Sequence, residues 1–503
     1  MPFPTLSDLA AKAIAQSIQN ETLSLDFPLD TKSSNNIARE ILALGGDSFK
    51  YLKVYKNQLS VSKIDFTCCN VDAEGVRNLI NFNLDSLDLG EMIQLKNNWP
   101  DKSHEDSIDI VSLLTQSLND CSRRSMIHLS LDYQEFSEGW EKELSQMLPH
   151  LRSIHIRSTV FNQRLQFSNF CACFPDLLAL DISCAYYLSG LQGIKNIENL
   201  QKLSMSYVDI MDINGYKELS ELKNLKYLNV SGTNLTAHTN GTNSIRKLLA
   251  AEVRMEALEF LDCSWTSVTE HELRIFAKNH PSLNTIAAIC TSCNQTAIPG
   301  IKMLNASSLS SLPACFEYLL SINQFDEVIE LIEEIFNSLG YIPGNLANSE
   351  LNHITNAVIF VLRESVGETT NLNTLMYYLE SGLFEHELAT SWFSTHIPEM
   401  IEFFYDVFDA VESTEFKEVF VEIIFGMLET IVKSVSPGIL IPDRVLCFVF
   451  EKTVNLVNQF PEYQNQGKEI IYQAVNWMSC DQFRKFSENS QLVRKVYEFI
   501  NSA

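Results

Sequence analysis

Residues 177–187 read LLALDISCAYY, residues 200–210 read LQKLSMSYVDI and residues 225–235 read LKYLNVSGTNL, and these three stretches decide the fold. Each has apolar residues at its first, fourth, sixth and eleventh positions, which is the pattern of a leucine-rich repeat. We predict that each stretch begins with a short strand whose side chains alternate between inside and outside, followed by a helix that returns the chain.

The same pattern recurs between residues 61 and 293, and only Gln94 breaks it. Most repeats start 23–26 residues after the previous one, and the two longer intervals contain polar inserts at residues 96–107 and 237–244. None of the repeats has Asn at the ninth position, so we expect irregular repeats without the usual Asn ladder. One repeat cannot bury its apolar face alone, so the sequence predicts a curved α/β leucine-rich-repeat solenoid over residues 46–305. The repeats start at Val61, Leu84, Met126, Leu151, Leu177, Leu200, Leu225, Leu258 and Leu283.

Alternate strand positions are expected to point outward, where a partner could bind. Trp265 is the most interesting of them, because an exposed Trp on a concave face is a candidate hot spot. Trp265 could equally fold back onto its own repeat. The outward positions that we expect are His155, Arg157, Asp181, Ser183, Tyr207, Asn229, Ser231, Asp262 and Trp265.

After Leu312 apolar residues recur three and four positions apart, which is typical of helices. We predict an all-α armadillo-like helical-repeat domain over residues 306–503, with a plain helical bundle as the alternative. The helices are expected at residues 314–320, 327–339, 351–362, 372–379, 400–411, 416–432, 443–459 and 467–478.

Charge and cysteine content restrict the partners and the compartment. The 503 residues carry a net charge of −26, which would repel nucleic acid and anionic membranes. Residues 311–430 hold 21 acids against two bases, Arg363 and Lys417. This excess predicts either a cationic ligand, such as a peptide with a free α-amino group, or an acidic surface that aids solubility. The cysteines form no disulfide framework, and neither a signal peptide nor a run of 18 apolar residues is read, so we expect a cytoplasmic or nuclear protein.

The sequence contains no pattern that we can assign to catalysis. There is no G-x-x-x-x-G-K-[ST] phosphate loop and no G-x-S-x-G elbow. His271-Glu272 and His386-Glu387 lack the second His that a zinc-protease helix carries four residues after the first, so both pairs are expected to be solvated helix positions. Cys290-x-x-Cys293 is a lone pair on a repeat strand, so both cysteines are expected to be small core residues. We therefore expect a non-enzyme that uses neither a cofactor nor a metal.

The N-terminal residues 5–14, TLSDLAAKAI, predict a helix with Thr5 or Ser7 at its start. Leu6, Leu9, Ala10, Ala13 and Ile14 would form one apolar stripe along it. A terminal helix can cover the open edge of a solenoid, or it can present its apolar stripe to a partner. Both interpretations remain open at this point.

The same segment resembles the elongin-binding box of VHL-type substrate receptors. Thr5, Leu6 and Ile14 fit the box, while Ala10 stands where that box has Cys. The resemblance implies that Leu6 enters a hydrophobic pocket of elongin C. Downstream, Phe27-Pro28 resembles the start of a cullin-binding box. Thr31 and Asn35 stand where that box has apolar residues.

A short helical box at residues 1–45, then leucine-rich repeats, then an armadillo-like domain is an order of parts that resembles the Zyg-eleven/Zer-one family. The resemblance implies a non-catalytic substrate-recognition subunit of a cullin-2–elongin B/C RING E3 ubiquitin ligase. It also implies protein substrates that carry N-terminal degrons. The family's Trp-Asn-x-Thr-Asp-Glu stretch is missing, so no degron-pocket residues are carried over. Two alternatives are a leucine-rich-repeat interaction scaffold and a divergent paralogue without ligase binding.

Overall fold

The protein, represented by a computed structural model, divides into two compact units, residues 1–305 and residues 306–503. Each unit is described by itself. The structure describes residues 6–44, 48–67, 73–91, 108–132, 135–162, 165–210, 212–232, 243–293, 296–305, 311–322, 328, 331, 425, 443–476, 478–488 and 490–501.

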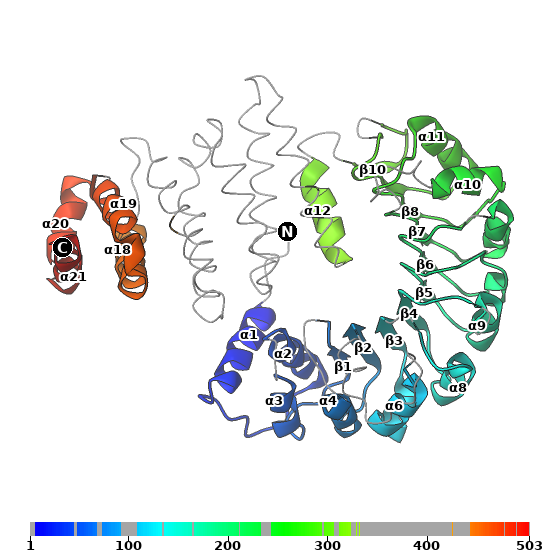
Figure 1. Cartoon of the computed structure of the whole chain (residues 1–503), viewed down its shortest axis with the longest axis horizontal. Helices are drawn as coiled ribbons and strands as arrows, with labels where there is room; N and C mark the ends of the chain where they lie inside the picture. Colours follow the sequence, from blue (N-terminus) through cyan, green and yellow to red (C-terminus); the bar gives the residue numbers. More distant parts are fainter. Residues whose placement is uncertain are drawn as a thin grey trace. The chain divides into compact units, whose positions relative to one another are not determined.

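The first unit is built on one parallel sheet of ten strands in strict sequence order, β1 to β10. Equivalent repeat positions pair across neighbouring strands, as Leu129 does with Ile154 and Leu203 with Leu228. This arrangement confirms the predicted leucine-rich-repeat solenoid (Figure 1). The strands are β1 (Lys63–Asp65), β2 (Ser86–Glu91), β3 (His128–Asp132), β4 (Ser153–Arg157), β5 (Ala179–Asp181), β6 (Lys202–Ser204), β7 (Tyr227–Asn229), β8 (Phe260–Asp262), β9 (Thr285–Ala287) and β10 (Lys302–Leu304).

Helices return the chain between the strands and cover the outer side of the sheet (Figure 1). Three repeats use 3₁₀-helices, which are tighter than α-helices, and in the first of them the 3₁₀-helix follows a short α-helix. The returning helices are α4 (Ala73–Arg77), η1 (Asn78–Asn81), α6 (Ile110–Ser117), α7 (Asp120–Ser125), α8 (Trp140–Met147), α9 (Phe167–Cys173), η2 (Ile194–Asn196), η3 (Ile213–Glu221), α10 (Ser244–Ala250) and α11 (Glu270–Asn279).

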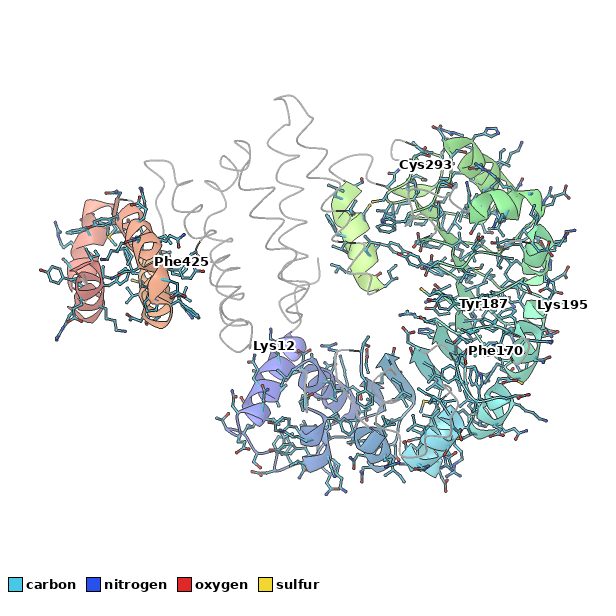
Figure 2. All side chains as sticks on the ribbon, in the orientation of Figure 1. Lys12, Phe170, Tyr187, Lys195, Cys293 and Phe425 are labelled. Atoms are coloured by element: carbon cyan, nitrogen blue, oxygen red, sulfur yellow. The ribbon has the colours of Figure 1, made fainter. Side chains whose placement is uncertain are left out.

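The core of this unit runs between the strands and the helices. The central inward residue of each strand from β1 to β9 is almost fully buried, with at most 2% of its surface exposed. Large rings such as Phe170 of α9 fill the space behind them (Figure 2). The sequence pattern missed β10, because its repeat begins at Gly300, where the pattern requires an apolar residue.

One predicted inward residue is wrong. Tyr187 stands at the eleventh position of its repeat, where Phe161, Ile210 and Val268 are buried, yet it is 83% exposed. Its backbone adopts the left-handed region, with φ of 58°, and this turns the ring outward. Leu188 is buried in the core instead, one position later than the pattern predicts.

The described residues of the second unit are helical. The predicted helix over residues 443–459 is confirmed, and those at residues 314–320 and 467–478 are confirmed with shifted ends. The last two helices were not predicted, and the other predicted helices lie largely outside the described residues. Gly467 packs closely against Val457 and Phe499. The helices are α12 (Leu312–Ser321), α18 (Asp443–Gln459), η6 (Pro461–Tyr463), α19 (Gln464–Asn476), α20 (Cys480–Glu488) and α21 (Ser490–Asn501).

Candidate protein-binding surfaces

Helix α2 (Thr31–Ala43) closes the open edge of the sheet at β1. The Asn35 side-chain oxygen accepts hydrogen bonds from the backbone N–H groups of Ser62 (2.9 Å) and Lys63 (3.2 Å). The Ser34 hydroxyl accepts a third from the N–H of Ser60 at 2.9 Å. An unpaired sheet edge would otherwise invite another strand, so α2 is the cap that a solenoid needs.

Helix α1 (Leu6–Gln19) packs against α2 and lies outside this cap. Ala11, Ala15 and Ile18 form its buried side, and Ile14 is half-buried against the same core. Ala10 is exposed, as are Ala13 and Lys12 (Figure 2). The expected stripe is therefore split between two faces. Because α2 caps the sheet, the exposed side of α1 is not needed to close the sheet edge.

The structure places the predicted elongin-box residues unevenly. Ala10 and Ile14 lie one turn apart on α1. Thr5 lies outside the described residues, and of Leu6 only the backbone, at the start of α1, is described. The sequence analysis missed Ala11 and Ala15 as the packing residues, because alanines occur on every side of this helix and do not mark a face.

Phe27 and Pro28, the predicted cullin-box residues, lie in the segment between α1 and α2. Both are exposed, and 62% of the Phe27 surface is open to solvent. The next residue, Leu29, donates its N–H to the carbonyl of Gln58 at 2.7 Å, which fixes the segment to the first repeat. Asp30 then caps α2 by accepting from the N–H of Ser33 at 3.1 Å.

Several residues expected to point outward on the strands are buried, because their side chains bond to their own backbone. Asp181 accepts a hydrogen bond from the N–H of Ser183, two residues on, at 2.9 Å. Asn229 and Asp262 accept equivalent bonds, also at 2.9 Å. This Asx turn recurs from repeat to repeat and takes the place of an Asn ladder. The buried residues of the expected set are Asp181, Ser183, Asn229, Ser231, Asp262 and Trp265.

Trp265 is only 7% exposed, so the hot-spot interpretation, which requires an exposed Trp on the concave face, is wrong. Its backbone has φ of 55° in the left-handed region. A different aromatic pair lies on the concave side, where the rings of Tyr227 (β7) and Phe260 (β8) stack with centroids 4.9 Å apart. These two residues begin adjacent strands, a position that we did not examine as outward-facing.

A charged cluster lies on β3, β4 and β5, separated from this aromatic pair by β6. Arg157 donates from Nε to the Asp181 carboxylate at 2.9 Å. The rings of His128 and His155 meet edge to face with centroids 4.6 Å apart, and His128 bonds to the Ser153 hydroxyl at 2.9 Å. Burial lowers the pKa of His155 to about 4, so the ring is neutral at physiological pH.

The carboxylates of the cluster differ in their environment. Burial by itself would raise the pKa of Asp181, but Arg157, His155 and the hydrogen bonds from Ser183 hold it below its usual range. Burial raises the pKa of Asp132, against a hydrogen bond from Ser158 and the attraction of Arg157. The cluster is largely satisfied internally, so it shapes the concave face more than it offers free groups.

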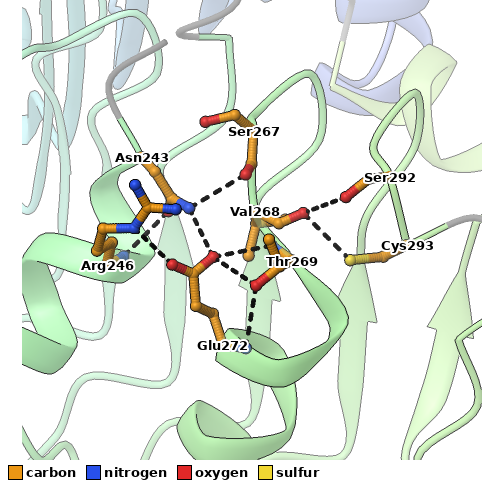
Figure 3. Close-up of polar contacts among 8 residues, drawn as sticks. All are labelled: Asn243, Arg246, Ser267, Val268, Thr269, Glu272, Ser292 and Cys293. Carbon is orange, nitrogen blue, oxygen red and sulfur yellow. Dashed lines mark hydrogen bonds and ion pairs between the residues drawn. The ribbon is translucent and has the colours of Figure 1, made fainter. Parts of the chain in front are cut away.

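Glu272 of the His271-Glu272 pair and Cys293 of the Cys290-x-x-Cys293 pair are parts of the scaffold (Figure 3), and the His386-Glu387 pair lies outside the described residues. The Glu272 carboxylate accepts from Arg246 Nε at 2.6 Å, Asn243 Nδ2 at 2.8 Å and the N–H of Thr269 at 2.9 Å. Glu272 thus completes the capping box of α11 and ties it to the N-cap of α10. Cys293 is buried, with its thiol 3.3 Å from the carbonyl of Val268. Glu272 is consequently not the solvated helix residue that we expected.

Searches for other kinds of site concern the described part of the chain only. Within it, no three His, Cys, Asp or Glu side chains are grouped so that they could hold a metal ion. The nine cysteines whose side chains are described are free thiols. No described helix is both long and apolar enough to cross a membrane.

Comparisons with known proteins bear on the family. No family model matches the sequence. The curated protein "Gastrulation-defective protein 3" of Caenorhabditis elegans is 26% identical over 341 residues, which is 66% of this chain and 47% of that protein. The chain thus spans about half the length of this relative.

Two solved structures are similar in part. An internalin from Listeria monocytogenes is 14% identical, with a TM-score of 0.27, over 52% of this chain and 64% of its own. A chain of the yeast Rad7–Elc1 complex is 12% identical, with a TM-score of 0.21, over 59% of this chain and 92% of its own. At such scores neither structure bears on the function. The nematode relative is a protein of the Zyg-eleven family, so this chain resembles that family, as the order of its parts predicted.

Proposed function

We propose that this protein is a non-catalytic substrate-recognition subunit of a cullin-RING ubiquitin ligase. The similarity to a Zyg-eleven family protein supports a role of this kind. The observation that carries the proposal is that the two N-terminal helices have different roles. Helix α2 closes the sheet edge through Ser34 and Asn35, so α1 can offer the side that carries Ala10 and Ala13 to a partner.

The partner proposed for α1 is elongin C, within an elongin B/C pair. Thr5, Leu6, Ala10 and Ile14 are the proposed contacts, with Leu6 as the anchor. Small side chains at Ala10 and Ala13 let a partner approach the helix backbone closely, and both are exposed. Ile14 is partly buried in the solenoid core, so it contributes a flank of the surface rather than its centre.

Cullin-2 is the proposed second partner, and it would contact the segment at Phe27 and Pro28. An exposed Phe is an apolar anchor that the fold itself does not use. Asn35, at a position that is apolar in the cullin box, bonds to the backbone of Ser62 and Lys63. Its side chain serves the fold, so the cullin contact is expected to depend mainly on Phe27 and Pro28.

The rest of the chain would present the substrate. We assign the second unit an armadillo-like arrangement, and we expect its acidic stretch at residues 311–430 to attract a cationic ligand such as a protein's free N-terminus. The concave strand face is a further surface for substrate proteins. The protein would act in the cytoplasm or the nucleus, where these ligases meet their substrates.

Co-purification of the full chain with elongin B/C tests the proposal. Capture of both elongins, lost in Leu6→Ser, is the expected result. Failure of the wild-type chain to bind elongin, with the chain folded, would overturn the receptor assignment. Two observations favour a divergent paralogue without ligase binding as the second candidate: Ala10 replaces the Cys of the box, and Asn35 is committed to the fold.

A further inference from the structure

We draw no further inference here: the strongest candidate, the surface patch of exposed apolar side chains Leu23, Phe27 and Val54 where the segment after α1 meets α3 (Phe49–Val54), carries nothing, because exposed acidic and basic side chains are mixed around it and nothing in the structure shows what covers it.

Discussion

Arg157 and Asp181 form an ion pair across neighbouring strands, with Nε and Oδ2 2.9 Å apart. The Asp181 side chain is nearly buried, and burial by itself would raise the pKa of this carboxyl, but Arg157, followed by His155 and Ser183, holds it below the ordinary value. His155 lies on the same strand as Arg157, directly opposite Asp181, and burial keeps it neutral. Two groups of this cluster therefore respond to acid in different pH ranges.

The first prediction concerns the pH dependence of stability. The pKa of His155 is about 4 in the folded chain against 6.5 for the ordinary side chain. Between these pH values the unfolded chain binds a proton at His155 that the folded chain does not. The stability that the neutral His155 contributes is therefore complete above about pH 6.5 and is lost as the pH falls. This contribution to the free energy of unfolding is at most about 3 kcal/mol. Asp181, with a lowered pKa, adds a loss only below about pH 4.

Tm measurements between pH 7 and pH 4.5 check this. The Tm should decrease with acid less steeply in His155→Gln than in the wild type. His150→Gln, at an exposed histidine of the preceding loop, should follow the wild-type slope. Identical slopes in all three chains would show that His155 does not carry the effect.

The second prediction concerns Gly232, which has φ of 83° and lies under the ring of Tyr207. A Cβ at this position would be 2.6 Å from the ring, so Gly232→Ala should combine backbone strain of about 1–2 kcal/mol with a steric clash. Gly300→Ala is the matched control, since Gly300 has φ of 80° and no atom within 4 Å of its Cβ position. Unfolding in urea should show a larger loss for Gly232→Ala.

A double variant isolates the clash. Tyr207→Ala should recover part of the loss in Gly232→Ala, because it removes the ring but leaves the backbone strain. If the stability losses of Gly232→Ala and Tyr207→Ala simply add in the double variant, the Tyr207 ring moves aside in Gly232→Ala without a cost in free energy.

The third prediction concerns the caps of α10 and α11. Burial would raise the pKa of Glu272, but Arg246, Thr269 and Asn243 together lower it. Glu272→Gln should destabilise the first unit by about 1–2 kcal/mol, because one carboxylate serves both helix starts (Figure 3). In Glu270→Gln, which loses only an exposed pair with Arg274, the loss should stay below about 0.5 kcal/mol. Equal losses in the two variants would contradict the shared-cap argument.

A structural feature could be predicted from the sequence when it recurs in several repeats. The strand positions recur in every leucine-rich repeat, so inward residues such as Leu129 and Ile154 could be predicted from the spacing alone. The Asx turns recur too, and the alternation of Asp or Asn with Ser, as in Asp181 and Ser183, would have revealed them. We read these residues as outward because the strand alternation ignores hydrogen bonds to the backbone.

Features that occur once could not be predicted in this way. In the repeat that contains Tyr187, the buried core position falls on Leu188, one residue later than the pattern predicts. No other described repeat shows the same shift. Likewise the faces of α1 depend on where α2 lies, and α2 is placed by Asn35, whose partners are backbone groups of the first strand. The exposure of Ala10 follows from that packing and cannot be read from the helix itself.

The last prediction is that Leu6 anchors elongin C and that the exposed side of α1 forms the contact. Burying one Leu side chain is worth about 1.5–3 kcal/mol, so Leu6→Ser should weaken binding about tenfold or more. Ala13→Arg should also weaken it, because a large charged side chain replaces a small exposed one without entering the core. Val54→Ser, an apolar-to-polar exchange at an exposed residue of α3 (Phe49–Val54), is the matched control and should bind normally.

Ala10→Cys distinguishes a working receptor from one that has lost its ligase. It restores the residue that the elongin-binding box has at this position, so binding should stay the same or tighten. Pull-down with elongin B/C measures all variants, and circular dichroism checks their folding. If only Ala10→Cys captures elongin, the chain is a divergent receptor whose helix retains the shape of the box. If no variant captures it, the receptor proposal is wrong, and α1 is only a helix that packs on α2, whose Ser34 and Asn35 already close the sheet edge.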